Sequence, residues 1–121
     1  NHFEGQVYII TGGNSFSATT LFTSALIRQE NVVVVGEETG GGGYGNSAWL
    51  IPDVTLPETG VRFRLPLFRL VIDKSRVKDG LGVQPEIFSF PSISAIKRNA
   101  DFKIEKVMEL IKEDQAKNKN P

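Results

Sequence analysis

The sequence has 121 residues, a length that suits one small domain. Its formal net charge is zero and no basic cluster lies between Asn1 and Asp73, which gives no reason to expect binding to nucleic acid or to anionic membranes. It contains no cysteine, so disulfides, zinc–thiolate sites and cysteine nucleophiles are excluded, and no apolar run approaches the ~20 residues that span a membrane.

The first third of the chain is predicted to form a strand, a helix and a second strand. Residues 6–10 are a short apolar run of β-formers, and residues 11–15 carry turn chemistry. A helix is expected from Ser17 to Gln29, with a buried face made of Ala18, Leu21, Phe22, Ala25 and Leu26. The four valines 32–35 indicate a parallel strand covered on both faces. Such a βαβ unit indicates the α/β fold class.

The middle of the chain is predicted to hold a loop and a hairpin. Glycine dominates residues 36–45, here called the Gly-rich loop, which can bring backbone close to a ligand. Strands are expected at 47–52 and 61–66, joined by a turn at 57–60. Residues 67–72 either continue the second strand or pair again.

The last third is predicted to be an extended segment at 82–87 followed by two helices. Ser92 or Ser94 is expected to cap a short helix that runs through Arg98. Asp101 is expected to cap the last helix, whose buried stripe consists of Ile104, Val107, Met108 and Ile111.

Ser17 stands where a strand-to-helix turn can expose a nucleophile. A serine at such a turn presents its hydroxyl, and the next backbone N–H, that of Ala18, can point at a developing oxyanion. The helix N-terminus adds positive potential for that charge. From the local pattern alone, however, a simple helix cap is the more common role of such a serine.

Other candidate groups carry weaker signals. The Gly-rich loop has no Walker lysine after its glycines, and no Gly-x-Gly-x-x-Gly opens a helix, which disfavours nucleotide binding. Glu37 and Glu38 are adjacent in an extended segment, so at most one of them faces a site. The one histidine, His2, is at the very start of the chain. We therefore expect no cofactor and no metal.

Three ordered motifs together resemble one family. Residues 16–20, Phe-Ser-Ala-Thr-Thr, resemble the Ser-Ala-Ser-Glu signature of the C-terminal processing (tail-specific) proteases. Residues 35–42 resemble their Val-Gly-Glu-x-Thr-x-Gly segment, and residues 80–87 resemble their Gly-x-Gly-Val-x-Pro-Asp-Ile segment. The resemblance covers nearly the whole chain and makes Ser17 the favoured nucleophile, with Ser15 as the alternative.

The resemblance implies a fold, a reaction and a compartment. It implies a crotonase-like (ClpP-like) α/β domain with C-terminal helices, of which residues 1–121 would be the C-terminal part, with the rest of the domain and often a PDZ domain before it. It implies hydrolysis of peptides or unfolded proteins near their C-termini through an acyl-enzyme. Members are usually exported to the periplasm, the cell envelope or an organelle lumen.

The sequence departs from the family where the catalytic base is concerned. Many members carry a lysine about where Gly42 stands, assisted by a glutamine that would fall near Asn46, but no lysine occurs between Asn1 and Asp73. The sequence resembles a second branch, similar to the tricorn core protease, with Thr-Gly-Gly-Gly in this loop. That branch implies an upstream histidine base and a later acidic partner, for which Asp79 is the nearest match. Gly41, Gly42 and Asn46 are the candidate loop positions beside the substrate.

These departures lead to two expectations and one alternative. Without a base, the isolated chain should not hydrolyse peptides. Without the rest of its domain, it should expose apolar surface and self-associate or exchange segments between copies. The alternative function is a catalytically dead module on the same fold that binds a peptide or a lipid. A histidine or lysine upstream that reaches Ser17 would decide for the enzyme.

Overall fold

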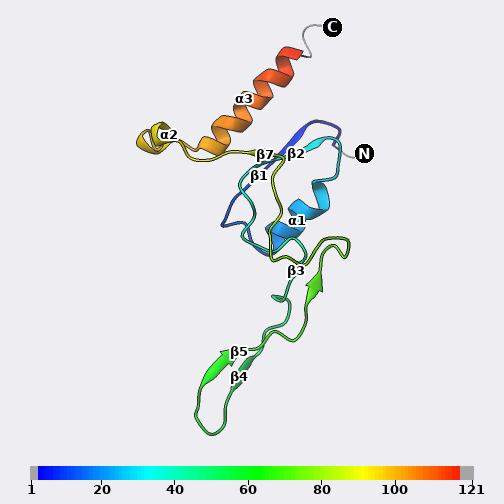
Figure 1. Ribbon diagram of the computed structural model, residues 1–121, viewed down its shortest axis with the longest axis vertical. Coiled ribbons are helices and arrows are strands. Elements are labelled where there is room, and N and C mark those ends of the chain that lie inside the picture. Colours follow the sequence, from blue (N-terminus) through cyan, green and yellow to red (C-terminus); the bar gives the residue numbers. More distant parts are fainter. Residues whose placement is uncertain (1–2, 118–121) are drawn as a thin grey trace.

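The centre of the protein is a three-stranded parallel sheet in the order β1-β2-β7 (Figure 1). The computed structural model describes residues 3–117. Strand β1 (Val7–Thr11) pairs with β2 (Val32–Gly36) over five residues, from Val7↔Val32 to Thr11↔Gly36, and β2 pairs with β7 (Ile87–Phe88). The valine run is thus the central strand, and the expected α/β class is confirmed.

Helix α1 (Ala18–Leu26) joins β1 to β2, as the predicted βαβ unit requires. A small core of Ile9, Val32 and Val34 packs against Val7, Leu26 and Ile27. The helix ends earlier than predicted, because a turn at Gln29, whose N–H donates to Leu26 O, leads the chain back into β2.

The buried face of α1 differs from the predicted one. The buried side chains are Thr20 and Thr23. Their hydroxyls donate to the nearby carbonyls Ser15 O and Thr19 O, so neither buried hydroxyl lacks a hydrogen-bond partner. Leu21 and Phe22 are exposed, by 39% and 55% respectively. Of the predicted face, Leu26 packs against the core, whereas Ala18 and Ala25 are exposed as well.

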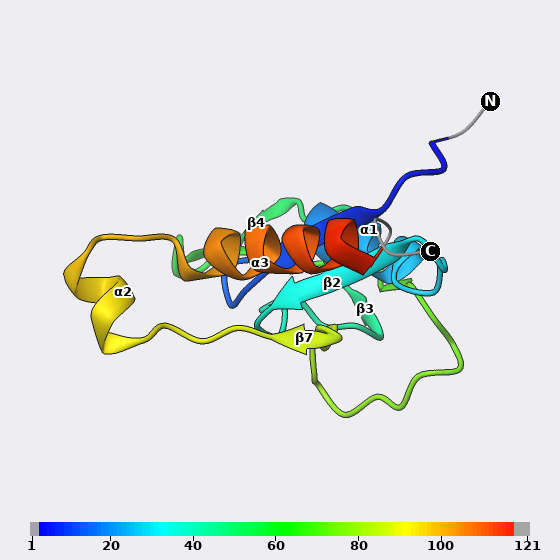
Figure 2. The same cartoon turned by 90° about the horizontal axis from the view of Figure 1, so that it is seen from above.

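Helix α3 (Phe102–Lys117) lies along β1 and β2 (Figure 2). Its inner side combines apolar and polar groups: Lys103, Val107, Leu110, Ile111 and Asp114. The predicted stripe is wrong for Ile104 and Met108, which are about half exposed. The hydroxyl of Tyr8 on β1 donates to Asp114 Oδ2, and this bond sets which side of the helix faces the sheet.

Both C-terminal helices begin at a capping side chain. Ser92 Oγ accepts from Ala95 N–H (3.0 Å) at the start of α2 (Ile93–Lys97), so the first of the two candidate caps is confirmed. Asp101 Oδ1 accepts from the N–H groups of Lys103 and Ile104 and caps α3. Within residues 3–117, no helix is both long and apolar enough to cross a lipid bilayer.

A hairpin projects away from the sheet (Figure 1). It consists of β4 (Asp53–Thr55) and β5 (Arg62–Arg64), with Val54 opposite Phe63. The predicted strand at 47–52 is wrong, because the turn at 57–60 pairs 53–55 with 62–64 and leaves, within 47–52, only Pro52 O and Leu50 O as acceptors for backbone N–H groups of the opposite side of the hairpin. At its base, β6 (Leu70–Val71) pairs again, with β3 (Gly45–Asn46).

The hairpin exposes large apolar side chains. They are Trp49, Leu50, Leu56, Val61, Phe63, Leu65, Leu67 and Phe68. Trp49 is 75% exposed. A two-stranded hairpin with an uncovered apolar face is at best marginally stable by itself in water, so this arm is a surface that lacks a partner within the described residues.

The contact between Tyr8 and Asp114 gives a prediction about stability. Tyr8→Phe should lower the free energy of unfolding by about 1 kcal/mol, because it removes one partly buried hydrogen bond between α3 and the sheet. The same bond raises the pKa of Tyr8 from 10.0 to about 12. A raised pKa means that the stabilisation is complete below pH 10.0 and is lost as the pH rises through about 12.

Urea unfolding followed by circular dichroism at neutral pH and above pH 10 measures both effects. Tyr44→Phe is the matched control, since the Tyr44 ring packs under Arg69 and keeps that contact without its hydroxyl. Equal stability of the Tyr8 and Tyr44 variants would show that the bond to Asp114 does not hold α3 in place.

Candidate active site

Ser17 occupies a strained position in the turn between β1 and α1. Its φ of 51° and ψ of −114° lie in a region that L-residues rarely adopt, at a cost of about 1–3 kcal/mol. Such a strained strand-to-helix turn is typical of catalytic serines whose hydroxyl must be exposed. Ser17 is exposed and its side chain makes no capping hydrogen bond, which argues against the simple role of a helix cap.

The backbone N–H of Ala18 follows Ser17 at the first position of the helix. Within the described residues this N–H donates no hydrogen bond, whereas Ser17 O already accepts from Leu21 N–H (3.0 Å). An unpaired N–H next to an exposed hydroxyl, at the positive end of a helix, is the arrangement that stabilises a developing oxyanion.

Ser15, the alternative nucleophile, has a structural role in the same turn. Its Oγ accepts from Gly12 N–H (3.2 Å) and its carbonyl accepts from Gly41 N–H (3.0 Å). Its hydroxyl is therefore already used to hold the turn together, and the geometry favours Ser17 as the reactive group.

The Gly-rich loop packs directly on this turn. A Cβ atom at Gly41 would collide with Thr20 Oγ1 and would come within 3.2 Å of Ser17 N. Gly41 is thus required by the close approach of the two backbones. A Cβ at Gly42 would meet only Gly45 O, at 3.2 Å. Gly42 therefore has room for a side chain that Gly41 lacks.

The third motif, residues 80–87, is held against the Gly-rich loop by side chains of that loop. Glu38 Oε1 accepts from Gly82 N–H (2.6 Å) and Thr39 Oγ1 accepts from Val83 N–H (2.8 Å). The Gln84 side chain and the Gly82 N–H hold the pKa of the Glu38 carboxyl below its usual value. Gly42 and Gly82 also form an isolated antiparallel bridge. The three motifs therefore meet in space, and Glu38 is bound in a structural contact.

Asp79 and Asn46 are not brought to Ser17. Asp79 is exposed and its Oδ1 accepts from Leu81 N–H (2.9 Å), while Asn46 Oδ1 accepts from Ala48 N–H (3.2 Å). No hydrogen bond joins either residue to Ser17 in the part of the chain that the structure describes. His2 lies outside the described residues.

Sequence reasoning missed one pair of charged residues beside the turn. Lys103 on α3 forms an ion pair with Glu37 (Nζ to Oε2, 2.5 Å), and both line the hollow that includes Gly12 and Ser15. Although no lysine occurs between Asn1 and Asp73, the fold thus brings one to the turn. No local signal could have revealed it, since 66 residues separate the partners along the chain, counted from Glu37 to Lys103.

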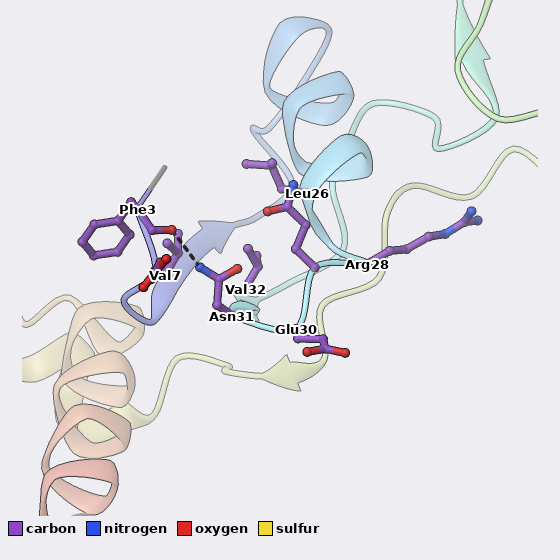
Figure 3. A pocket seen from close by; sticks show the side chains of 9 residues that line it. Phe3, Val7, Leu26, Arg28, Glu30, Asn31 and Val32 are labelled. Carbon is purple, nitrogen blue, oxygen red and sulfur yellow. Dashed lines mark hydrogen bonds between the residues drawn. The ribbon is translucent and has the colours of Figure 1, made fainter. Parts of the chain in front are cut away.

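A separate hollow of 730 Å³ lies at the amino ends of β1 and β2 (Figure 3). Asn31 in its wall donates to the carbonyls of Phe3 and Gly5. In open parallel sheets, ligands bind at the carboxyl ends of the strands, which is where β1 leads into the Ser17 turn and β2 into the Gly-rich loop. The hollow in Figure 3 is at the other end and contains no nucleophile.

The chain belongs to peptidase family S41. The sequence profile of that family matches residues 1–89, a stretch that contains all three motifs, and so confirms their resemblance to the C-terminal processing proteases. The crystal structure of a candidate peptidase from Parabacteroides merdae is also similar, with a TM-score of 0.69 and 26% sequence identity. That match covers 89% of this chain but 32% of the other, so this chain spans about a third of that relative's length. No curated protein matches the chain.

The close packing of Gly41 gives a prediction. Gly41→Ala should destabilise the protein by about 1–3 kcal/mol, because the new methyl group must displace the buried Thr20 side chain from the Ser17 turn. Chemical denaturation measures the loss. Gly13→Ala is the matched control in the same site, since a Cβ there meets no atom within 4 Å. Similar stability of the two variants would contradict the tight packing of the loop on the turn.

Proposed function

We propose that residues 1–121 form the C-terminal part of the catalytic domain of a serine endopeptidase, in which Ser17 is the nucleophile. The observation that carries this proposal is the strained, exposed and uncapped conformation of Ser17, followed by an unpaired N–H at Ala18. Membership of peptidase family S41 supports the reaction class.

The proposed reaction begins with attack of Ser17 Oγ on the carbonyl carbon of a peptide bond. The carbonyl oxygen becomes an oxyanion, and Ala18 N–H donates to it together with a second donor from the rest of the domain. A general base takes the serine proton and passes it to the departing amine, which leaves an acyl-enzyme that water then hydrolyses.

The general base belongs to a part of the enzyme other than residues 3–117. Gly42 stands where many relatives carry a lysine, and the described residues contain no histidine. We assign the base to an upstream histidine, with Asp79 as its acidic partner, as in the branch similar to the tricorn core protease. This assignment requires the loop at Asp79 to move toward Ser17 when the domain is complete.

The rest of the proposal concerns the whole enzyme. The βαβ unit and its helices would belong to a crotonase-like domain completed by upstream strands, with a PDZ domain before it. The substrates would be peptides or unfolded proteins, bound along Gly41, Gly42 and Asn46 and cleaved near their C-termini. The enzyme would be exported to the periplasm, the cell envelope or an organelle lumen.

A binding module for peptides or lipids on the same fold is the second candidate. Its support is the lack of any base within hydrogen-bonding reach of Ser17 among residues 3–117. The strain at Ser17 disfavours it, because a binding surface has no need of an exposed hydroxyl in a costly conformation.

Labelling with a fluorophosphonate probe tests the nucleophile. In a longer natural chain that contains these residues and an upstream base, Ser17→Ala should abolish labelling, whereas Ser15→Ala should keep it at a reduced rate because only the turn is loosened. The 121-residue chain alone should label slowly and cleave no unstructured peptide. Labelling that survives Ser17→Ala, or rapid stoichiometric labelling of the short chain, would contradict the proposal.

Self-association follows from the same incompleteness. The outer face of α1 and the apolar face of the hairpin are uncovered within the described residues, and faces of this kind pair with other chains. We expect oligomers of the 121-residue chain in sedimentation at rising concentration. Phe22→Ser and Phe63→Ser should weaken them, while Val77→Ser, at an exposed loop position, should not. A monodisperse monomer at high concentration would contradict this prediction.

A further inference from the structure

Among the basic side chains in the described ion pairs, that of Lys103 is the least exposed to solvent. Its side chain is 17% exposed, while the basic partners of the other pairs are exposed by 34–75%. It extends from the first turn of α3 to the carboxyl ends of β1 and β2, where its Nζ meets Glu37 Oε2 at 2.5 Å. The Glu37 side chain is 36% exposed, so the lysine is the shielded partner and would be left without its counter-ion if Glu37 were removed.

The lysine contacts the roots of both loops that form the candidate site. A Cβ atom at Gly12, the first residue after β1, would collide with Lys103 Nζ. A Cβ at Gly36, the last residue of β2, would come within 3.3 Å of Lys103 Cδ. The side chain therefore lies over the backbone at the point where the Ser17 turn and the Gly-rich loop leave the sheet.

Backbone contacts extend this junction to the site itself. Glu37 is bound to β1 through its N–H, which donates to Thr11 O (3.1 Å), and through its carbonyl, which accepts from Thr11 Oγ1 (2.8 Å). Gly12 N–H donates to Ser15 Oγ, and Ser15 O accepts from Gly41 N–H. The two loops are thus joined at their roots by Lys103 and Glu37, and again beside Ser17 by Gly41 and Ser15.

Two other roles for Lys103 fit these contacts poorly. A lysine that acts as general base must have lost its proton and lie within reach of the serine hydroxyl, whereas Lys103 Nζ is paired with a carboxylate and lies over Gly12. An ion pair with both side chains in water would contribute little, but the Lys103 side chain is 17% exposed and lies over two glycines.

We infer that Lys103 and Glu37 are positioning residues that fix the Ser17 turn against the Gly-rich loop. The inference rests on the proposed role of Ser17. It also goes beyond the family match, which ends at residue 89, before α3 begins. Helix α3 would then act on the nucleophile from outside the matched region.

Hydrogen exchange tests this inference without requiring activity. In the 121-residue chain, Lys103→Met and Glu37→Gln should each speed exchange of the hydrogen-bonded amides of the two loops about tenfold, while the amides of β2 exchange as before. The hydrogen-bonded amides to be followed are those of Gly12, Ser15, Thr39 and Gly41. Lys103→Arg should restore most of the protection. Lys106→Met is the matched control, since Lys106 pairs with Glu109 on the same helix, away from both loops.

Kinetics in a longer, active chain provide the second readout. Lys103→Met and Glu37→Gln should lower kcat about tenfold with little change in KM, and the double variant should lose no more than either single one, because the residues act as one unit.

Two exchange results would overturn the inference. One is an exchange rate at both loops equal to that of the Lys106→Met control, and the other is a rise in exchange rate that is as large in β2 as in the loops. If Lys103→Met fails to fold, Glu37→Gln and Lys103→Arg decide by the same criteria. If Ser17→Ala does not abolish labelling, the proposed function is contradicted, but the exchange result still tests whether Lys103 and Glu37 fix the two loops.

Discussion

Parallel pairing of β1 with β2 is the constraint on which the rest of the structure depends. Five consecutive residue pairs align the two strands so that both end at the same edge, at Thr11 and Gly36. The Ser17 turn and the Gly-rich loop leave from that edge and are therefore forced together. The contacts between the loops, including the hydrogen bond from Gly41 N–H to Ser15 O, follow from this alignment. Both loops lie within the stretch that the profile of peptidase family S41 matches, residues 1–89.

The strain at Ser17 is balanced by ordinary contacts around it. A serine with φ of 51° persists only where the surrounding structure fixes it. Here the fixing groups are the Ser15 hydroxyl and carbonyl in the turn, the Gly41 backbone in the loop and the Thr20 hydroxyl in the first turn of α1. None of them is a charged group. The turn is thus built mainly by backbone geometry. Charges enter at its root, through Glu37 and Lys103, and through Glu38, whose carboxylate accepts from Gly82 N–H.

Local patterns predicted the parts of the fold that local forces decide. The β-branched run of β2, the caps at Ser92 and Asp101 and the turn at 57–60 depend on neighbours in sequence, and they were predictable. The buried side of each helix was not. α1 buries Thr20 and Thr23, whose hydroxyls bind carbonyls only five and four residues back along the chain. α3 turns Lys103 and Asp114 inward because their partners, Glu37 and Tyr8, lie far away in sequence.

The residues of the candidate site also fall into those that the sequence predicted and those that it did not. The sequence pattern was sufficient to single out Ser17 and to bring Gly41 to it, since both lie in motifs. Lys103 could not be found from the pattern, because its contact with Gly12 and Glu37 depends on how α3 docks. Asp79 and Asn46 are occupied by local turns in the described structure, so their proposed roles depend on the rest of the domain.

The position of Trp49 has a practical consequence. It is the one tryptophan in the sequence, and it lies 75% exposed between β3 and β4, outside the three-stranded sheet that defines the fold. Its emission is therefore governed by the water and by whatever covers the arm. Intrinsic fluorescence of this chain reports on the occupancy of the arm, and a blue shift on mixing with another polypeptide marks docking there while the valine sheet remains spectroscopically silent.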